Sequence, residues 1–213
     1  MGFKGLAITL FLAAVGAAGF GTTFAQAQMT IVGFGDSLMA GYELENGEGF
    51  PARLEAELKA RGHAVSIVDA GVSGDTTSGG LARLDWSIPD GTDGVILELG
   101  ANDALRGVPP QEARANLEAM IVRLQERGIE VLLAGMLAPP NLGADYEAAF
   151  NAIYPDLAAK YDLLLYPFFL DGVTGVPGMV LSDGMHPNAK GINRMAEGFV
   201  PVAEQFIDRI KAR

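Results

Sequence analysis

Five short apolar runs alternate along this chain with longer amphipathic stretches, and this alternation limits the possible folds more than any other feature. Runs of this length are typical of strands that are buried in a sheet. Strands that alternate with helices predict a parallel sheet with helices on both faces. Right-handed crossovers then favour one doubly wound layer. The predicted strands are Met29–Gly35, Ala64–Asp69, Gly94–Leu99, Val131–Met136 and Leu163–Tyr166.

The amphipathic stretches predict four long helices, at 51–61, 111–127, 145–160 and 188–213. The first begins at Pro51, where a missing N–H is harmless, and ends before Gly62. Pro155 is expected to kink or divide the third helix. The sequence shows no internal repeat and no low-complexity linker, and its 213 residues suit one domain. We therefore expect a single α/β domain over residues 28–213.

The first 27 residues have the pattern of a secretory signal peptide. Lys4 precedes an apolar stretch at 6–20, and Ala25–Ala27 offers small residues at the two positions that signal peptidase reads. A membrane anchor is the alternative, but this stretch is shorter than the ~20 residues that span a bilayer. We expect cleavage before Gln28, a periplasmic or secreted location, and no integral membrane segment in the mature chain.

Composition excludes several classes of site and partner. The sequence has no cysteine, which excludes disulfides, thiolate-bound zinc and a cysteine nucleophile. Removal of residues 1–27 takes away Lys4 and no acid, so the formal net charge changes from −11 to −12. So acidic a surface repels nucleic acid and anionic lipid, and we expect neither as a partner.

Binding sites in open parallel sheets form beyond the carboxyl ends of the strands. Ser37 is the only one of six serines that directly follows the first predicted strand. Small residues before it allow a sharp turn that exposes its hydroxyl. Because position 39 is Met, the segment is not a Gly-x-Ser-x-Gly elbow. Leu38 also stands where a dinucleotide-binding fingerprint would have its third glycine.

The chain has only two histidines. His63 lies in a helix-to-strand turn at the opposite end of the sheet, where we expect a solvated surface residue. His186 lies before the last predicted helix, three residues after Asp183, and Gly184 between them permits a tight turn. A carboxylate there could hold the imidazole in one tautomer and stabilise its protonated form. An ordinary loop histidine is the alternative.

Acyl transfer also requires hydrogen-bond donors for the oxyanion that develops during the reaction. Gly74, in a glycine-broken loop after the second strand, could expose its backbone N–H. Asn102, after the third strand, offers an uncharged amide. Taken singly, each is a common turn residue. Their joint occurrence at successive strand ends favours an acyl-transfer site.

Four short segments follow one another along the chain: Gly35-Asp36-Ser37-Leu38, Gly74, Gly100-Ala101-Asn102-Asp103 and Asp183-Gly184-Met185-His186-Pro187. In this order they resemble the sequence blocks of the GDSL, or SGNH, hydrolase family. Further segments, at 36–42, 73–77, 81–84 and 167–170, resemble the subgroup of periplasmic acyl-CoA thioesterases, lysophospholipases and arylesterases. The resemblance covers essentially the whole mature chain.

This resemblance implies a flavodoxin-like three-layer α/β/α sandwich with a five-stranded parallel sheet. It also implies that Ser37 is the nucleophile, His186 the base and Asp183 the acid that orients the base. The oxyanion hole would consist of the backbone N–H groups of Ser37 and Gly74 with the side chain of Asn102.

Three further carboxylates, Asp36, Asp75 and Asp103, belong to the same strand-end segments. Such a group could suggest a metal, but a site with a Ser-His pair needs none. We expect no metal and no cofactor, and we expect Asp36 and Asp103 to brace loops.

The expected activity is hydrolysis of small-molecule carboxylic esters, through an acyl-enzyme. Aryl esters, short acyl esters and lysophospholipids fit best, with acyl thioesters as a further class. Acyl-CoA fits less well, because coenzyme A thioesters are cytoplasmic and this chain is expected to be exported. Two alternatives remain open: a carbohydrate O-deacetylase of the same family, and a non-catalytic binding protein on this scaffold.

The loop after the fourth strand, at 138–143, leaves the sheet on the same edge as Ser37. Two prolines stiffen its first half, while Gly143 leaves its far end free to move. We expect Leu142 in this loop to contact the acyl chain of the substrate. An ordinary strand-to-helix connection is an equally good interpretation.

Overall fold

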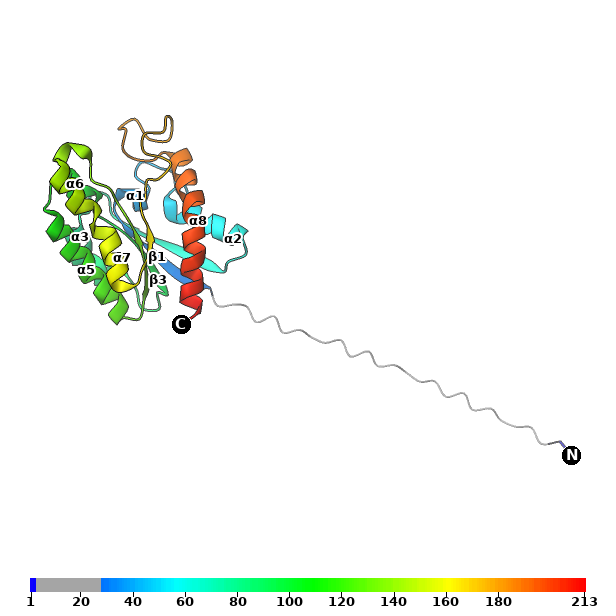
Figure 1. The fold of residues 1–213 in the computed structure, drawn as a ribbon. Helices are drawn as coiled ribbons and strands as arrows, with labels where there is room; N and C mark the ends of the chain where they lie inside the picture. The colour runs from blue at the N-terminus through cyan, green and yellow to red at the C-terminus, as the bar shows by residue number, and fades with distance from the viewer. Residues whose placement is uncertain (3–27) are drawn as a thin grey trace.

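The computed structural model describes residues 1–2 and 28–213 (Figure 1). The predicted signal peptide, residues 1–27, lies outside the described residues apart from Met1 and Gly2. Among the helices that are described, none combines the length and the apolar character needed to cross a membrane.

The centre of the molecule is a five-stranded sheet in which all neighbouring strands are parallel, in the order β2-β1-β3-β4-β5. All five predicted strands are confirmed, with ends that move by at most two residues. The order reverses between β1 and β3, which is the switch point where doubly wound folds bind ligands. The strands are β1 (Met29–Gly35), β2 (Val65–Gly71), β3 (Gly94–Glu98), β4 (Glu130–Ala134) and β5 (Leu164–Tyr166).

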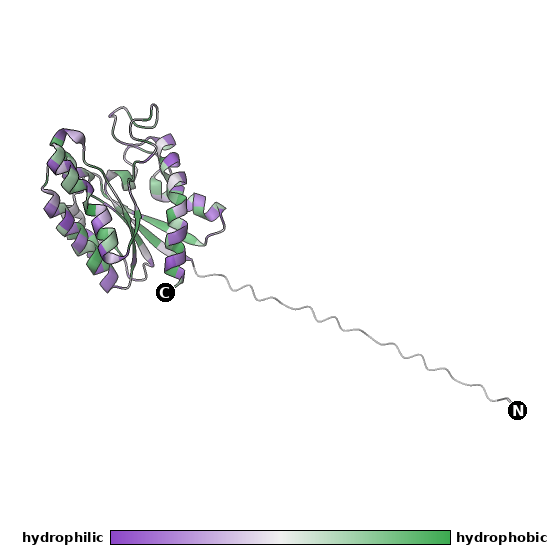
Figure 2. Cartoon of the chain, in the orientation of Figure 1, coloured by the Kyte–Doolittle hydropathy of each residue, from purple (hydrophilic) through white to green (hydrophobic). Residues whose placement is uncertain are grey.

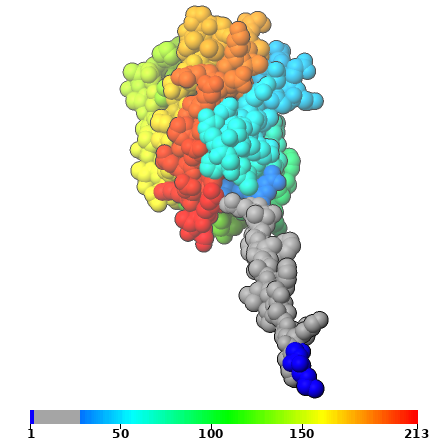
Figure 3. Space-filling model, turned by 90° about the vertical axis from the view of Figure 1, so that its right-hand side faces the viewer, coloured from blue at the N-terminus to red at the C-terminus, as the bar shows by residue number. Residues whose placement is uncertain are grey.

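Helices cover both faces of the sheet, which confirms the predicted three-layer sandwich. On one side, α2 (Phe50–Ala60) and α8 (Ala189–Lys211) pack against each other (Figure 3). The other side carries α3 (Thr77–Ser87), α5 (Pro110–Glu126), α6 (Ala144–Asn151) and α7 (Ile153–Tyr161) (Figure 1). Short helices follow the ends of three strands: α1 (Ser37–Ala40), α4 (Ala101–Leu105) and the 3-10 turn η1 (Pro140–Leu142).

The stretch at 145–160 is divided into two helices, as Pro155 predicted, and the break falls at Ala152. Pro155 accounts for the break, since it has no N–H to donate to the carbonyl of Asn151. The helix α3 was not predicted from the sequence, because Gly79 and Gly80 weaken its intrinsic helix propensity.

The hydrophobic core lies between the sheet and its two helical layers, so apolar residues fill the interior and polar ones cover the outer helix faces (Figure 2). One aromatic cluster bears directly on the site. Phe169, in the connection after β5, packs edge-on against Phe50 of α2 and Phe199 of α8, at ring-centroid distances of 4.7 and 6.1 Å. This contact anchors the long connection that lies over α1 at the end of the sheet (Figure 1).

Candidate active site

Ser37 is the first residue of α1 and directly follows β1. The Asp36 carboxylate caps this helix by accepting the N–H of Leu38 at 3.0 Å. Gly35 is required here, because a Cβ at this position would lie 2.4 Å from Glu98 Oε2. The sharp exit from β1 leaves Ser37 only 9% exposed, with its side chain at the floor of a cleft.

The structure brings Ser37, His186 and Asp183 into one chain of hydrogen bonds. The distance from Ser37 Oγ to His186 Nε2 is 2.8 Å, and that from His186 Nδ1 to Asp183 Oδ2 is 2.5 Å. A carboxylate at Nδ1 keeps the proton on that nitrogen, which leaves Nε2 free to accept the serine proton. This is the arrangement by which a histidine acts as a general base toward a hydroxyl.

The second oxygen of Asp183 binds the backbone of the loop that carries His186. Asp183 Oδ1 accepts the backbone N–H groups of Met185 at 2.9 Å and His186 at 3.0 Å. The Met185 bond, followed by the bonds to the His186 ring and backbone, lowers the pKa of Asp183 to about 2. The carboxylate is therefore ionised at any pH at which an esterase would be assayed.

Asn102 lies in the first turn of α4, and its side chain lines the same cleft as Ser37 and His186. Its Nδ2 donates one hydrogen to Asp36 Oδ2 at 3.0 Å. A primary amide has two such hydrogens. The bond to Asp36 fixes which way the amide faces, and the second hydrogen remains available to a substrate oxygen.

Gly74 does not line the cleft, and it lies in a loop that two arginines hold in place. Arg106, at the end of α4, donates to the carbonyl of Gly74 at 2.8 Å. Arg83 of α3 pairs with Asp75 at 2.5 Å and also donates to the carbonyls of Gly35 and Ala70. Among the described residues, the N–H groups of Ser37 and Gly74 have no hydrogen-bond acceptor. Both predicted backbone donors are thus uncommitted.

A buried acid near Ser37, Glu98, was not predicted from the sequence. Glu98, the last residue of β3, is fully buried and accepts the backbone N–H of Asp36 at 3.2 Å. The sequence feature that could have revealed Glu98 is its position as the single charged residue of an otherwise apolar strand. Burial, and then the nearby Asp36 carboxylate, raises the pKa of Glu98 well above its usual range. Burial likewise raises the pKa of Asp36, to about 6.

The other carboxylates near the site hold neighbouring segments together through hydrogen bonds and an ion pair. Asp103 accepts the backbone N–H and the hydroxyl of Thr77, at 2.8 and 2.6 Å, which ties α4 to the start of α3. Asp75 pairs with Arg83. In the part of the chain that is described, no group of three or more His, Asp or Glu side chains is arranged to hold a metal ion.

The cleft above Ser37 has a volume of about 540 Å³ and mostly apolar walls. Three large apolar side chains at its edge are exposed, namely Leu105 (59%), Leu137 (46%) and Met185 (52%). The predicted contact residue Leu142 does not line the cleft, although Ala138, Pro139 and Pro140 of the same loop do. The remaining lining residues are Ser37, Leu38, Ala101, Asn102, Ala104, Met136, Phe168, Leu170, Thr174, Val180, Gly184 and His186.

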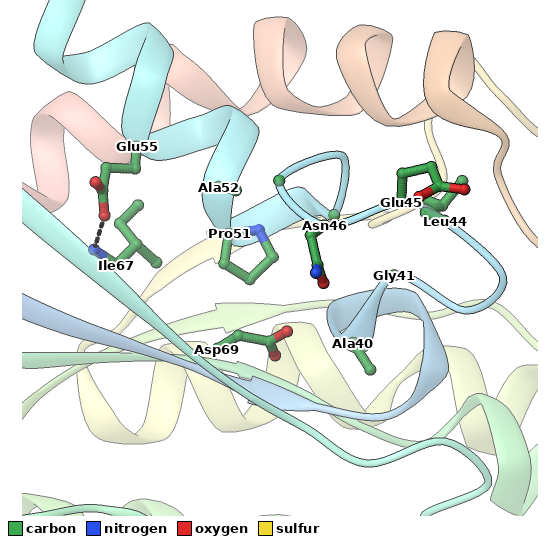
Figure 4. Close-up of a pocket in the computed structure, with 12 residues that line it drawn as sticks. Ala40, Gly41, Leu44, Glu45, Asn46, Pro51, Ala52, Glu55, Ile67 and Asp69 are labelled. Atoms are coloured by element: carbon green, nitrogen blue, oxygen red, sulfur yellow. Dashed lines mark hydrogen bonds between the residues drawn. The ribbon is translucent and has the colours of Figure 1, made fainter.

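A second hollow of about 330 Å³ lies on the other side of α1, between α2 and β2 (Figure 4). It has a more polar lining, which includes Glu45, Asn46 and Asp69. Glu55 at its edge accepts the backbone N–H of Ile67 at 2.6 Å. Neither Ser37 nor either histidine lines it, and two of its carboxylates, Glu55 and Asp69, accept backbone N–H groups.

His63 is remote from the site, as predicted, but it is not freely solvated. Its ring pairs with Glu204 of α8 at 3.2 Å, and its side chain is only 20% exposed. The turn that carries it packs against α8, a contact that connects residues 141 positions apart. His186 is thus the one described histidine near a serine hydroxyl.

Comparison with known proteins identifies the family of this chain. The model of the GDSL-like Lipase/Acylhydrolase family matches residues 34–193. Esterase TesA of Pseudomonas aeruginosa is 38% identical over 182 residues, which are 85% of this chain and 90% of that protein. Thioesterase 1/protease 1/lysophospholipase L1 of Escherichia coli K12 is 39% identical over 165 residues, which are 77% of this chain and 78% of that protein.

Among solved structures, AlinE4, an SGNH-hydrolase family esterase, is 46% identical and superposes with a TM-score of 0.72. The match covers 84% of this chain and 97% of AlinE4. The family model includes every segment that contributes to the cleft, and the matches to these relatives cover most of the chain. The chain therefore belongs to the GDSL-like lipase/acylhydrolase family and is a serine ester hydrolase.

Proposed function

We propose that Ser37, His186 and Asp183 form the catalytic triad of this hydrolase, with an oxyanion hole made by the N–H groups of Ser37 and Gly74 and the amide of Asn102. The observation that carries the proposal is the unbroken chain of hydrogen bonds from Ser37 Oγ through the imidazole to Asp183. A binding protein on the same scaffold would have no need of this alignment.

The first half of the reaction follows from these contacts. As Ser37 Oγ attacks the ester carbonyl carbon, its proton passes to His186 Nε2, and the carbonyl oxygen becomes an oxyanion. Donors pre-aimed at that oxygen lower the barrier, because the negative charge develops only as the new bond forms. The oxyanion then collapses, the bond to the alcohol oxygen breaks, and the alcohol leaves with the proton from His186.

The second half repeats the sequence with water. His186 Nε2 takes a proton from water as the water oxygen attacks the acyl-enzyme carbonyl, and Ser37 Oγ leaves with that proton. The products are a carboxylic acid and the free enzyme. Asp183 stays ionised throughout and stabilises the imidazolium in both halves, and no step requires a metal or cofactor.

The proposed substrates are small-molecule carboxylic esters with an apolar acyl or aryl group. The apolar cleft and its exposed edge at Leu105, Leu137 and Met185 support this class over acetylated carbohydrates, whose hydroxyls would need polar partners. Aryl esters, acyl esters and lysophospholipids are the expected members, and acyl thioesters are a further class. Substrate contact by Leu142 stays a prediction.

The test uses the chain without residues 1–27, a fluorophosphonate probe, and p-nitrophenyl esters from acetyl to decanoyl. Wild type should hydrolyse the esters and take up the probe on Ser37 alone. Ser37→Ala should lose both properties, with a fall in kcat of ~10⁴–10⁶. Ser78→Ala, at an exposed serine of α3, is the matched control and should behave as wild type. Turnover by a folded Ser37→Ala protein would reject the assignment.

We also propose that the protein is exported to the periplasm or beyond, with a mature chain that begins at Gln28. The signal-peptide pattern of residues 1–27 supports this location. Expression of the full chain, followed by N-terminal sequencing of the enzyme recovered outside the cytoplasm, tests it. An intact N-terminus on that enzyme would contradict cleavage.

A further inference from the structure

The two nitrogens of the His186 ring are both held, but only within the plane of the ring. Its Nε2 meets Ser37 Oγ and its Nδ1 meets Asp183 Oδ2. These hydrogen bonds and the covalent bond to Cβ all lie at the edge of the ring, so they make no contact with its two faces. The loop around it is tied down through its backbone by Asp183, but its residues from Ser182 to Met185 are exposed.

The side chain that covers the face of this ring is Tyr42. The centroids of the two rings lie 4.4 Å apart, with a tilt of 35° between their planes. At this separation the rings are in van der Waals contact. Tyr42 is not one of the described residues that line the cleft, so it contacts the imidazole from outside the substrate site.

The backbone of Tyr42 is tied to the helix that carries the nucleophile. Its N–H donates to the carbonyl of Ser37 at 3.2 Å. Gly41 ends α1 in the left-handed conformation, with φ of 70°, and passes so close to Gly49 that a Cβ would lie 2.9 Å from its Cα. Glu43 is also left-handed, with φ of 57°, although it has a side chain. Such strain persists only where neighbouring contacts fix the backbone.

We propose that Tyr42 is a positioning residue for catalysis, which keeps the His186 ring in the orientation that meets Ser37. When the imidazole is protonated during the reaction, the Tyr42 ring faces the resulting cation. This inference rests on the proposed roles of Ser37 and His186. Tyr42 and Ser37 come from one short segment, while His186 and Asp183 come from another. The ring contact therefore fixes the two halves of the triad relative to each other. The electron-rich face of an aromatic ring also attracts a cation such as imidazolium.

Kinetics of three variants test the proposal. Because a misplacement of about 1 Å can cost ~100-fold in rate, Tyr42→Ala should lower kcat by ~10–100-fold. The KM for p-nitrophenyl acetate should stay within about twofold, since Tyr42 does not line the cleft. Tyr42→Phe keeps the aromatic face and should retain at least about half of the wild-type kcat. Tyr42→Leu keeps apolar bulk alone and should remain impaired.

Trp86→Ala is the matched control, because Trp86 is an aromatic residue of α3 that is 77% exposed and does not line the cleft. It should retain wild-type kinetics. Thermal unfolding of each variant shows that it is folded. Wild-type kcat in Tyr42→Ala, full activity in Tyr42→Leu, or an effect on KM alone would each overturn the positioning role. None of these results would affect the Ser37 assignment, which depends on loss of activity in Ser37→Ala.

A spectroscopic readout is independent of turnover. In a His63→Gln background, His186 is the single histidine, and its Nδ1 proton in the bond to Asp183 can be followed by NMR. Tyr42 should slow exchange of this proton with water by covering the ring. Exchange should therefore be faster in Tyr42→Ala and close to wild type in Tyr42→Phe. Equal exchange in wild type and Tyr42→Ala would overturn the proposal.

Discussion

Asn102 Nδ2 lies 3.0 Å from Asp36 Oδ2, so the amide expected to stabilise the oxyanion is oriented by the residue directly before Ser37. Both Asp36 oxygens are used, since Oδ1 caps α1 through Leu38. One carboxylate thereby positions the serine and the amide together. It does so at a cost, because this carboxylate is completely buried and lies beside Glu98.

Asp36→Asn should lower the activity and should increase the stability near neutral pH. An asparagine can still cap α1, but its NH₂ would face the NH₂ of Asn102. Relief of this donor–donor contact requires Asn102 to turn its oxygen toward residue 36, which misdirects the amide at the substrate. Loss of one oxyanion donor costs ~10²–10³ in kcat. Steady-state kinetics should show this fall with KM little changed, and a wild-type kcat would contradict the orienting role.

The same variant should alter how stability depends on pH. Burial raises the pKa of Asp36 from 3.8 to about 6 in the folded state. The folded protein therefore binds this proton more tightly than the unfolded chain, so the group stabilises below pH ~4 and loses that contribution as pH rises through about 6. The free energy of unfolding should therefore fall less with rising pH in Asp36→Asn than in wild type, by up to about 3 kcal/mol.

Urea unfolding between pH 4 and 7 measures that effect. Asp90→Asn, at a carboxylate whose side chain is fully exposed, is the control and should follow the wild-type curve. A decline of the same size in wild type and Asp36→Asn would show that Asp36 does not carry the buried charge.

Asn102→Ala should lower turnover more than it weakens substrate binding. Its amide serves the oxyanion of the transition state more than the ground-state carbonyl, so kcat should fall by ~10²–10³. Kinetics on p-nitrophenyl butyrate give kcat and KM separately. An effect confined to KM would indicate that Asn102 only places the substrate.

Substitution of the two histidines should have clearly different effects on activity. His186→Ala removes the acceptor of the serine proton and should lower kcat by ~10⁴–10⁶. His63→Ala removes the contact with Glu204 and should leave kinetics unchanged, with a small loss of stability on the order of 1 kcal/mol or less. Ester hydrolysis and thermal unfolding of both variants check this. An inactive His63→Ala enzyme would reverse the assignment.

Chain-length preference should depend on the exposed apolar edge of the cleft. Leu137→Ala removes methylene contacts worth about 0.8 kcal/mol each, so kcat/KM for octanoyl and decanoyl esters should fall roughly tenfold relative to acetyl. Leu142→Gly tests the residue predicted from sequence. Selective loss on long esters would support its contact with the acyl chain, whereas an equal change across the series leaves that loop a simple connection.

Much of this architecture could be predicted before any coordinates were known. Strand and helix periodicity located all five strands and the helices at 50–60, 110–126 and 189–211. The helix α3 escaped notice because its two glycines are poor helix formers, and its stability comes from packing against α5. Tertiary contacts of this kind leave no local signal.

The sequence by itself determined where the proposed catalytic residues stand. Ser37, Asn102 and His186 stand in short segments at strand ends or before the last helix, and parallel strands bring such segments to one edge whatever their separation. Only the tertiary structure decided what surrounds them. The contact of Tyr42 with His186, the burial of Glu98 and the exclusion of Leu142 from the cleft depend on how strands and loops pack, and this packing is set by contacts between residues far apart in the chain.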